Sequence, residues 1–598
     1  MMSVRASDRP ALEPRRTALD WRARTLRAAL PELLAAPALG LDTETTGLDP
    51  RSHRLRLVQF ALPDGRVYVV DLFRVDPRLL APVLADAPRI IGHNLKFDLA
   101  FLAAAGLPVP TGGRLFDTML AGQLLGAGEP EGRLDRCGLA AIVERFLGQT
   151  LDKIEQRSDW SGPLTDAQLA YAARDAAVLL PLAAGLEAQL ARAKLERVAA
   201  LEMRCLPAIG WLELTGAPFD ADAWARLSDR AVEAQVRLEQ EMTALAGAAD
   251  LFGDGTINWR SPEQVKAVLR ARGHTVDTTD EATLGRLAPD EPLAGLMLHY
   301  REASRQASAY GIDFLRHVAP TTGRIHADYL QLGTETGRMS CTRPNLQNIP
   351  RDPAYRACFR PPPGRVLVKA DYSQIELRVA AEISGDRRML EAYRDGEDLH
   401  AVTAAAVLGR ANGTVTKEDR QAAKALNFGL IYGMGSDTLR AHAARSYGVA
   451  LSEREAASFR STFFRTYPGL RRWHEGQPRG AVNTHTLAGR RRLAVESFTR
   501  KVNTPVQGTA GDGMKTALAL LWETRDRCES AAPVLCVHDE IVVECDAAEA
   551  DRARTWLADC MMAGMGELLT KVPVVVEATI EGDWSGAEVL PPPPSGPQ

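Results

Sequence analysis

The sequence has few cysteines, and none is arranged to build a metal site or a disulfide framework. The eight cysteines are scattered over 598 residues, without a CxxC pair or a cluster with histidine. This spacing argues against structural zinc and against disulfides. We expect reduced thiols in a cytosol-like compartment.

Long apolar runs are also missing. None approaches the roughly 18 residues that a membrane span requires, and the Ala/Leu stretch near residue 30 is interrupted by Pro31 and Glu32. We therefore expect a soluble protein with no membrane partner.

A basic excess is missing as well. The formal net charge of -4 gives no global sign of nucleic-acid binding, although carboxylate clusters that bind metal would offset basic grooves elsewhere. At roughly 150 residues per domain, the length predicts about four compact units.

The two ends of the chain have little apolar periodicity. The first residues are rich in arginine, as in a targeting segment, but Asp8, Glu13 and Asp20 favour an ordinary flexible extension over residues 1–37. The ending PPPPSGPQ predicts a disordered tail over residues 589–598.

Between these ends, the residue pattern changes twice. Strand patterns alternate with Ala/Leu-rich helical patterns to about residue 195, which predicts an α/β domain. Residues 196–330 are mostly helical and suit an extended arm. Beyond them come further strand patterns, a helical block over residues 386–485 and a hairpin at 534–545. The predicted fold class is therefore α/β and α+β, with several domains.

A first group of acids lies in the N-terminal α/β region. Asp42 and Glu44 alternate in a strand pattern, so both side chains are expected on one face. Asp98 begins a helical pattern, and Tyr171 and Asp175 are four residues apart on one helical face. Four carboxylates can hold two magnesium ions, one activating water and one stabilising the leaving 3′ oxygen, while a phenol orients the water. Taken singly, each residue favours an ordinary solvated acid or core edge, whereas the residues taken together favour a site.

This order of residues resembles the ribonuclease H-like 3′-to-5′ exonuclease fold of proofreading polymerases, and also the related RNA-trimming nucleases. Phe97 stands where polymerase-linked relatives often have tyrosine, so a hydrogen bond to the substrate strand is expected to be missing while stacking remains. Leu48 resembles an apolar wedge that separates terminal bases; an ordinary core leucine is an equal alternative.

A second group of acids follows two apolar patterns. Asp371 ends a strand pattern, and Asp539 and Glu540 lie in the hairpin pattern VLCVHDEIVVEC. Apolar neighbours would bury the strands, while the acids at the strand end and hairpin tip stay free to bind cations. Two metals roughly 4 Å apart can polarise an attacking hydroxyl and stabilise a leaving oxygen at phosphorus. These segments predict a two-metal nucleotidyl-transfer site.

A helical pattern between the two segments has a regular stripe. Arg420, Lys424, Phe428 and Tyr432 recur every four residues. Two cations followed by two aromatic rings suit the phosphates, sugar and base of a nucleoside triphosphate. On its own, the stripe favours an amphipathic helix with solvated cations and buried rings.

Five segments together resemble the DNA polymerase I family, family A. They are TETGRMSCTRPNLQNIP (334–350), DYSQIELR, the striped helix, NTPVQGTAGD (503–512) and VHDE, in that order. The resemblance covers roughly residues 38–585 and corresponds to the large fragment. A separate 5′ nuclease is not expected, because only about 37 residues precede the first motif. The implied right-hand polymerase follows an exonuclease domain (38–195) and consists of a helical thumb and connection (196–330), palm (331–385 and 486–588) and fingers (386–485).

The resemblance implies roles for residues of the polymerase site. Asp371, Tyr372 and Asp539 would be ligands of two Mg²⁺ ions, with Glu540 assisting catalysis, and two further Mg²⁺ ions would occupy the exonuclease site; Mn²⁺ can substitute. Glu376 resembles a steric gate against the 2′ hydroxyl, and an ion pair with an arginine is compatible with that role. The residues implied in dNTP binding are Gln374, Glu376, Arg420, Lys424, Phe428 and Tyr432.

The resemblance also implies a DNA track. The implied residues are Arg338, Asn345, Gln347, Asn503, Gln507 and His538. Asn345 and Gln347 are equally credible as turn caps, and His538 as a structural residue. Gln421 stands where many relatives carry a second arginine, which leaves one phosphate or template contact in doubt. The basic runs 490–492 and 500–501 are expected to be solvated and to follow the DNA backbone.

The predicted function is template-directed DNA synthesis with 3′-to-5′ proofreading, in replication or repair. The expected partners are primer-template DNA, a single-stranded 3′ end and dNTPs, and the expected state is a monomer in the cytoplasm, associated with the nucleoid, or in a host cytoplasm if viral. Three rivals are an RNA-directed nuclease, a single-subunit RNA polymerase and a non-enzymatic DNA-binding scaffold. The acid sets disfavour the first and third, and Glu376 disfavours the second.

Overall fold

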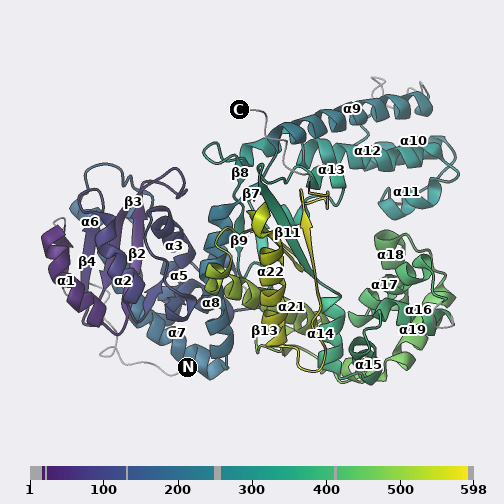
Figure 1. The fold of residues 1–598 in the computed structure, drawn as a ribbon. Coiled ribbons are helices and arrows are strands. Elements are labelled where there is room, and N and C mark those ends of the chain that lie inside the picture. Colours follow the sequence, from purple (N-terminus) through teal and green to yellow (C-terminus); the bar gives the residue numbers. More distant parts are fainter. Residues whose placement is uncertain (1–15, 21–22, 130–131, 248–256, 410–413, 590–598) are drawn as a thin grey trace.

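The N-terminal third of the chain is built on a six-stranded mixed sheet (Figure 1). In this computed structural model the described residues are 16–20, 23–129, 132–247, 257–409 and 414–589. The strand order is β1-β4-β3-β2-β5-β6. The strands are β1 (Arg16–Asp20), β2 (Leu39–Thr45), β3 (Leu55–Ala61), β4 (Arg66–Asp71), β5 (Ile90–Gly92) and β6 (Leu115–Asp117). The strand patterns predicted near residues 38–72 are thus confirmed.

The first residues are more ordered than predicted. We expected a flexible extension over residues 1–37, but β1 pairs in parallel with β4, and helix α1 (Ala23–Ala35) buries Leu26 and Leu33 completely. These leucines are seven residues apart and therefore share one helical face. The prediction was wrong for residues 16–37, while residues 1–15 and 590–598 lie outside the described part of the chain.

Helices α6 (Asp166–Ala177) and α7 (Leu179–Ala193) cover the sheet. The segment Asp166–Ala193 is long and apolar enough, by length and composition alone, to cross a membrane, and 61% of its apolar 18-residue stretch is buried inside the protein. At β2, a Cβ added to Gly40 would lie 2.9 Å from the Ala176 carbonyl oxygen. Close packing against the sheet explains the small apolar residues of this segment.

A helical arm follows, as predicted. Helix α8 (Glu196–Thr215) links the first sheet to the centre of the molecule, and α9 (Ala221–Ala246) and α12 (Pro292–Ala309) form a long helical pair (Figure 1). The shorter helices α10 (Pro262–Ala271) and α11 (Glu281–Leu287) lie at its outer end, where α11 lies against α18 (Ser436–Tyr447). The arm packs around its own small core, which includes Trp259 and Tyr300.

The central sheet is antiparallel, in the order β14-β15-β11-β16. Its strands are β11 (Arg365–Tyr372), β14 (Ala532–Val537), β15 (Glu540–Asp546) and β16 (Val576–Glu581). The long helix α21 (Phe498–Glu523) packs on α22 (Ala550–Gly566), which in turn covers β11, β15 and β16. Apolar residues on both faces bury most of β11 and β15. The charged side chains within these strands, Lys369 and Glu544, form ion pairs, while Asp371 and Glu540 lie near the strand ends.

The remaining lobe is helical. Its helices are α14 (Ile375–Ser384), α15 (Arg387–Arg394), α16 (Leu399–Leu408), α17 (Lys417–Ile431), α18, α19 (Glu453–Thr466) and α20 (Pro468–Glu475). The helical pattern ends at Glu475, earlier than the predicted 485, because β12 (Val482–His485) pairs with β13 (Arg491–Val495). The sequence analysis did not predict this hairpin. All eight cysteines are free and buried.

Candidate active sites

The central sheet brings the second group of acids together. Asp371 lies at the end of β11, directly opposite Glu540 on one side and Glu577 on the other. Asp539 lies in the turn between β14 and β15, and its carbonyl oxygen accepts a hydrogen bond from the Tyr372 backbone N–H at 3.2 Å. The strand end and the hairpin tip therefore meet, as the two apolar patterns predicted.

The acids of this site repel one another. Partial desolvation and the neighbouring charges of Asp539, Glu540 and Glu577 raise the pKa of Asp371 to about 7. Burial also raises the pKa of Asp539 to about 6, although Arg338, whose Nη2 is 3.8 Å from Asp539 Oδ1, opposes that rise. A cation bound between such groups would relieve their mutual repulsion.

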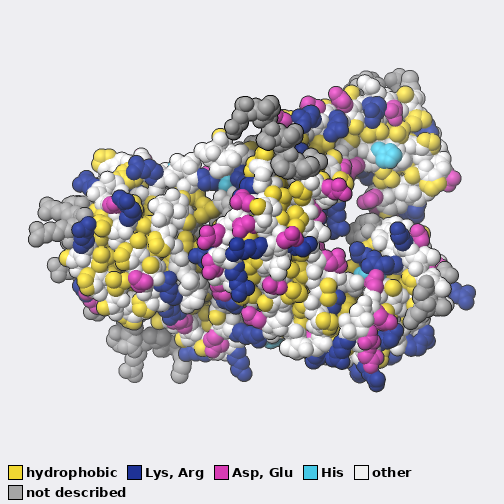
Figure 2. Space-filling view, viewed as in Figure 1, with side chains coloured by type: hydrophobic (Ala, Val, Ile, Leu, Met, Phe, Trp, Pro, Cys, Tyr) yellow, Lys and Arg dark blue, Asp and Glu magenta, His cyan; other side chains and the backbone are white. Residues whose placement is uncertain are grey.

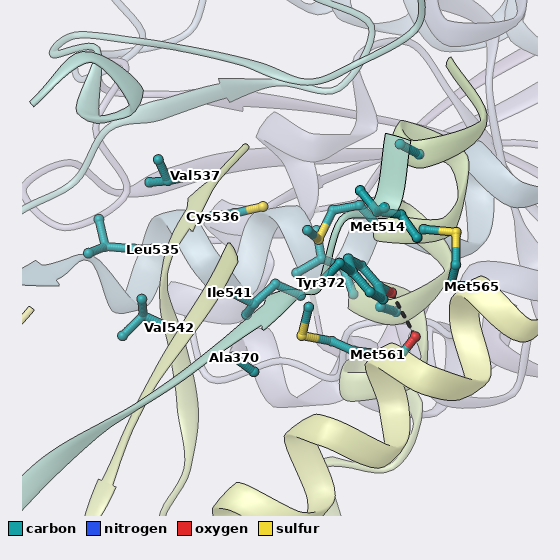
Figure 3. Close-up of a cluster of buried hydrophobic side chains, with 14 of the residues drawn as sticks. Ala370, Tyr372, Met514, Leu535, Cys536, Val537, Ile541, Val542, Met561 and Met565 are labelled. Atoms are coloured by element: carbon teal, nitrogen blue, oxygen red, sulfur yellow. Dashed lines mark hydrogen bonds between the residues drawn. The ribbon is translucent and has the colours of Figure 1, made fainter. Parts of the chain in front are cut away.

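Tyr372 has a different orientation from the acids. Its ring is buried, and its hydroxyl donates a hydrogen bond to the Met561 carbonyl oxygen at 2.6 Å, beside Met514 and Met565 (Figure 3). The phenol therefore belongs to the core, and only the backbone carbonyl of Tyr372 remains as a candidate metal ligand.

Glu540 is held by a residue that the sequence analysis did not single out. The Trp584 indole donates a hydrogen bond from Nε1 to Glu540 Oε1 at 2.6 Å, and both side chains are buried. Burial raises the pKa of Glu540, and this hydrogen bond opposes the rise.

Glu376 has partners on two sides. It forms an ion pair with Arg338 and accepts a hydrogen bond from the Tyr432 hydroxyl. Burial raises the pKa of Tyr432, and Gln507 of α21 opposes that rise. The ion pair that we weighed as an alternative to the gate role is present. Arg338 thus faces the acids in this structure.

The striped helix is confirmed as α17, with Tyr432 as its C-cap residue. Arg420 forms an ion pair with Asp398, and the same carboxylate accepts a hydrogen bond from Gln374 Nε2 at 3.1 Å. Phe428 is half-buried, with its ring 5.9 Å from that of His400. Lys424 is partly exposed on the same helix, and Gln421 is exposed.

The predicted DNA-contacting residues are spread around this site. Asn345 Oδ1 accepts a hydrogen bond from the Gln347 backbone N–H at 3.0 Å, so the turn-cap interpretation holds for Asn345. Gln347 Nε2 donates to the Cys536 carbonyl oxygen at 3.4 Å, and His538 occupies the exposed turn with φ of +56°. Asn503 lies on α21. A small pocket in this region is lined by residues that include Arg338, Gln347, His538 and Asp539.

Most of the basic residues expected to be solvated are buried. Arg490 forms ion pairs with Glu202 and Asp512, and Arg492 pairs with Glu335. Lys501 Nζ donates to two backbone carbonyls, so only Arg491 and Arg500 remain accessible. Figure 2 shows Lys and Arg side chains interspersed with Asp and Glu over one face of the molecule, in keeping with a net charge near zero.

The N-terminal sheet brings the first group of acids together. Asp42 and Glu44 lie on the same face of β2, Asp98 lies in the first turn of α3 (Leu95–Ala104), and Tyr171 and Asp175 lie on α6. Asp98 accepts a hydrogen bond at 2.5 Å from the hydroxyl of Thr43, a residue absent from our predicted set.

Burial and mutual repulsion also raise the pKa values in this group. Desolvation and the neighbouring acids raise the pKa of Asp42 well above its ordinary value and that of Glu44 to about 8. Burial raises the pKa of Asp98 to about 7. Asp175 Oδ1 is buried without a hydrogen-bond partner among the described residues. A buried carboxylate oxygen of this kind suits a metal ligand.

Two neighbours of the first acid group differ in exposure. Phe97 is half-buried and packs on Phe101, with ring centroids 4.9 Å apart. Leu48 is 84% exposed, which excludes the core-leucine alternative. An exposed leucine four residues after Glu44 agrees with the predicted wedge.

The acids of each group are neighbours, but their side chains do not converge on one metal position. Across residues 16–589, apart from the undescribed gaps, no three Asp, Glu, His or Cys side chains lie together closely enough to hold a metal ion. The acids are near enough to raise each other's pKa values, and their carboxylate oxygens are the donors that Mg²⁺ prefers. The residues therefore fit the predicted metals by donor type, and each ligand assignment stays a prediction.

Comparison with known proteins identifies the two regions of the chain that contain these sheets. A model described as DNA polymerase family A matches residues 222–586, which is more than half of the chain, and one described as 3′-5′ exonuclease matches residues 22–191. The chain belongs to DNA polymerase family A. It is a DNA-directed DNA polymerase with a 3′-to-5′ exonuclease domain, and the predicted multidomain fold class is confirmed.

The relatives of this family A polymerase include proteins of different lengths. It is 35% identical to DNA polymerase I of Aquifex aeolicus, over 94% of this chain and 98% of that protein. It is 33% identical to DNA polymerase I of Pseudomonas aeruginosa, over 94% of this chain and 65% of that protein. Among solved structures, the POL domain of Pol1 from M. smegmatis, in complex with DNA primer-template and dNTP, matches with a TM-score of 0.80 and 25% identity, over 96% of this polymerase and 100% of that chain.

Family membership removes the RNA polymerase and scaffold rivals. Four further residues contact the predicted groups: Thr43, Lys153, Asp398 and Trp584. Asp398 follows a glycine and an acid in a loop, and Trp584 lies near the chain end, so no local pattern marks either residue. Only their long-range contacts reveal them.

Proposed function

We propose that Asp371 and Asp539 hold two Mg²⁺ ions at which a primer 3′ end is extended, with Glu540 assisting. The proposal depends on one observation above all, the meeting of a strand end and a hairpin tip whose acids raise each other's pKa values. When bound, the metals polarise the primer hydroxyl and stabilise the departing pyrophosphate. Mn²⁺ can substitute for Mg²⁺.

The neighbouring residues would orient the incoming nucleotide. Arg420 and Lys424 would hold the phosphates, and Phe428 would lie near the sugar. A triphosphate would have to draw Arg420 away from Asp398, its partner here. Gln374 shares that acid, so it would be released together with Arg420.

Other residues of the site would recognise the sugar and the template. Glu376, fixed between Arg338 and Tyr432, would form a wall against a 2′ hydroxyl. Tyr432 would lie beside the templating base. The proposed DNA track consists of Arg338, Asn345, Gln347, Asn503, Gln507 and His538.

The exonuclease site would act separately on a single-stranded 3′ end. We propose that Asp42, Glu44, Asp98 and Asp175 hold two further Mg²⁺ ions, and that the Tyr171 hydroxyl orients the attacking water. The unpartnered Asp175 Oδ1 supports a metal at that position. Burial and the neighbouring charge of Asp175 raise the pKa of the Tyr171 hydroxyl, which is consistent with a phenol that lies beside the acids.

The relatives support part of the proposed wider setting. The M. smegmatis domain binds DNA primer-template and dNTP, and we propose the same partners here. We further propose a monomeric, cytoplasmic enzyme associated with the nucleoid, which serves replication or repair. The proposed domains are exonuclease to residue 195, thumb and connection (196–330), palm (331–385 and 486–588) and fingers (386–485).

One assay tests both sites at once. A primer with a mismatched 3′ end is annealed to a template and incubated with Mg²⁺ and dNTPs. The products are expected to show trimming of the mismatch before extension. Extension without trimming would contradict the exonuclease proposal, and trimming without extension would contradict the polymerase proposal.

A further inference from the structure

Lys153 places a positive charge inside the exonuclease acid group. Its Nζ lies 2.8 Å from Asp175 Oδ2 and 3.4 Å from the Tyr171 hydroxyl, and it lies 5.4 Å from the centre of the Tyr171 ring. The contact is not a surface ion pair, since the side chain of Asp175 is only 7% exposed. Lys153 is therefore positioned among the groups that the proposed function assigns to metal binding and water orientation.

The segment that carries Lys153 is fixed against the same helix. Lys153 precedes a short 3₁₀ turn, Ile154–Arg157. Gln168 of α6 donates hydrogen bonds from Nε2 to Ser158 Oγ and to the Asp159 carbonyl oxygen, each at 3.0 Å. Trp160 is buried, with its ring 6.3 Å from that of Tyr171. The backbone of the segment is thus held in place, while the lysine stem has four rotatable bonds.

The charges of the site explain why a lysine is useful there. Four ionised carboxylates and two divalent metals sum to zero, and a phosphodiester of the bound strand then adds one negative charge. One lysine balances that charge. Without metals, the same lysine is attracted to Asp175, as observed. When a metal occupies the carboxylate, it repels the ammonium group and frees it for another anion.

The surface beside Lys153 suits a nucleotide strand. Ile154, the next residue, is 80% exposed, and Leu48 near the opposite acids is 84% exposed. Large apolar side chains exposed next to a charged site offer contact surfaces for sugars and bases. A phosphate at Lys153 would therefore have apolar surface next to it.

We propose that Lys153 is a substrate-binding residue of the exonuclease, which exchanges its ion pair with Asp175 for a backbone phosphate of the single-stranded 3′ end when metals bind. The inference depends on the proposed exonuclease site. It assigns two partners to one ammonium group, one before and one after metal binding.

The test compares Lys153→Met, Lys153→Arg and, as a matched control, Arg157→Met, which removes an exposed charge from the same turn. Trimming of a single-stranded oligonucleotide is measured at increasing NaCl. Lys153→Met is expected to lower kcat/KM by about 10-fold, a typical effect of losing one charge-assisted hydrogen bond. The slope of log kcat/KM against log salt should become less steep by about 0.7, as expected for one lost phosphate contact with a single strand. Lys153→Arg and Arg157→Met should keep the slope.

A second measurement needs no turnover. Mn²⁺ binding without DNA is followed by EPR in a background that carries both Asp371→Ala and Asp539→Ala, so that the remaining proposed sites belong to the exonuclease. Because Lys153 competes with metal for Asp175, Lys153→Met should bind Mn²⁺ as tightly as the parent or more tightly. Weaker Mn²⁺ binding, or an unchanged salt slope, would overturn the proposal and leave Lys153 as a support for the acid geometry.

Two controls separate the possible failures. Extension of a matched primer by Lys153→Met reports that the variant is folded. Asp42→Ala tests the exonuclease site itself, because trimming that survives this change would refute the proposed site. If Asp42→Ala abolishes trimming and Lys153→Met leaves the salt slope unchanged, only the role of Lys153 is refuted.

Discussion

Tyr432 donates a hydrogen bond to Glu376, which joins the C-terminal end of α17 to the first turn of α14. The second carboxylate oxygen of Glu376 forms an ion pair with Arg338. The acid is therefore held from two sides, and its position depends on the helical lobe as well as on the central sheet. A carboxylate that is fixed in this way can discriminate between sugars by steric exclusion.

The gate assignment predicts a change in sugar selectivity. Glu376→Ala removes the wall, so ribonucleotide incorporation relative to deoxynucleotides should rise by about 10-fold or more. Single-nucleotide kcat/KM values for matched rNTP and dNTP measure the ratio. Tyr432→Phe removes the hydrogen bond but keeps the ring, and should change the ratio less. Unchanged selectivity in Glu376→Ala would contradict the assignment.

The two acid groups should be separable by mutation. Asp371→Ala or Asp539→Ala should abolish primer extension and leave 3′ trimming, because the groups belong to different sheets. Asp42→Ala should do the reverse. Each activity is measured on one purified variant with Mg²⁺, and circular dichroism checks folding. Loss of both activities from a folded single variant would refute the two-site arrangement.

Local patterns predicted the parts of both sites that depend on neighbouring residues. The alternation around Asp42 and the apolar residues on both sides of Asp371 were sufficient to place these acids on strands. Arg490 and Arg492 were misjudged because their partners, Glu202 and Glu335, are distant in sequence. A basic run resembles a solvated surface until the fold supplies buried acids for it. Helix α1 was missed because two leucines seven residues apart give a weak local signal.

The hydrogen bond from the indole of Trp584 should affect the pKa of an acid in the second group. Trp584→Phe keeps a ring but removes the hydrogen bond to Glu540, which at present lowers the pKa of that acid. The pKa of Glu540 should rise further, so the acidic limb of the extension pH profile should move to higher pH. Steady-state kcat/KM for dNTP addition across pH measures the shift.

Trp556→Phe is the matched control for that prediction. It removes a comparable indole hydrogen bond, from Trp556 Nε1 on α22 to Thr524 Oγ1 at 2.9 Å. Both variants should lose about 1–3 kcal/mol of stability, as expected when a buried partner is left unsatisfied. A pH shift in both variants would assign the effect to stability and not to Glu540.

A buried ionic cluster around Glu202 should contribute strongly to the stability of the central part of the molecule. Glu202 of α8 is fully buried and pairs with Arg490 and Lys515, whose Nζ lies 2.6 Å from Glu202 Oε1. Glu202→Ala leaves two buried cations without that partner and should cost about 3–5 kcal/mol. Glu523→Ala removes the partly exposed pair with Arg204 and should cost about 0–1 kcal/mol. Urea unfolding of both variants measures the difference, and equal losses would contradict the predicted role of burial.

The raised pKa values of the exonuclease acids predict how stability depends on pH without metal. The pKa of Glu44 is about 8 and that of Asp98 about 7, both well above the values near 4 expected in an unfolded chain. Between about pH 4 and 8, the folded state therefore binds more protons than the unfolded state, so stability falls as pH rises through this window.

Calorimetry in EDTA should show the transition of the exonuclease domain moving to lower temperature from pH 5 to 8. Added Mg²⁺ should restore the lost stability, because bound cations neutralise the repulsion among the carboxylates, as protons do at lower pH. Asp98→Asn should flatten the metal-free pH dependence and weaken the response to Mg²⁺. A metal-free stability that rises over the same range would contradict the repulsion among these acids.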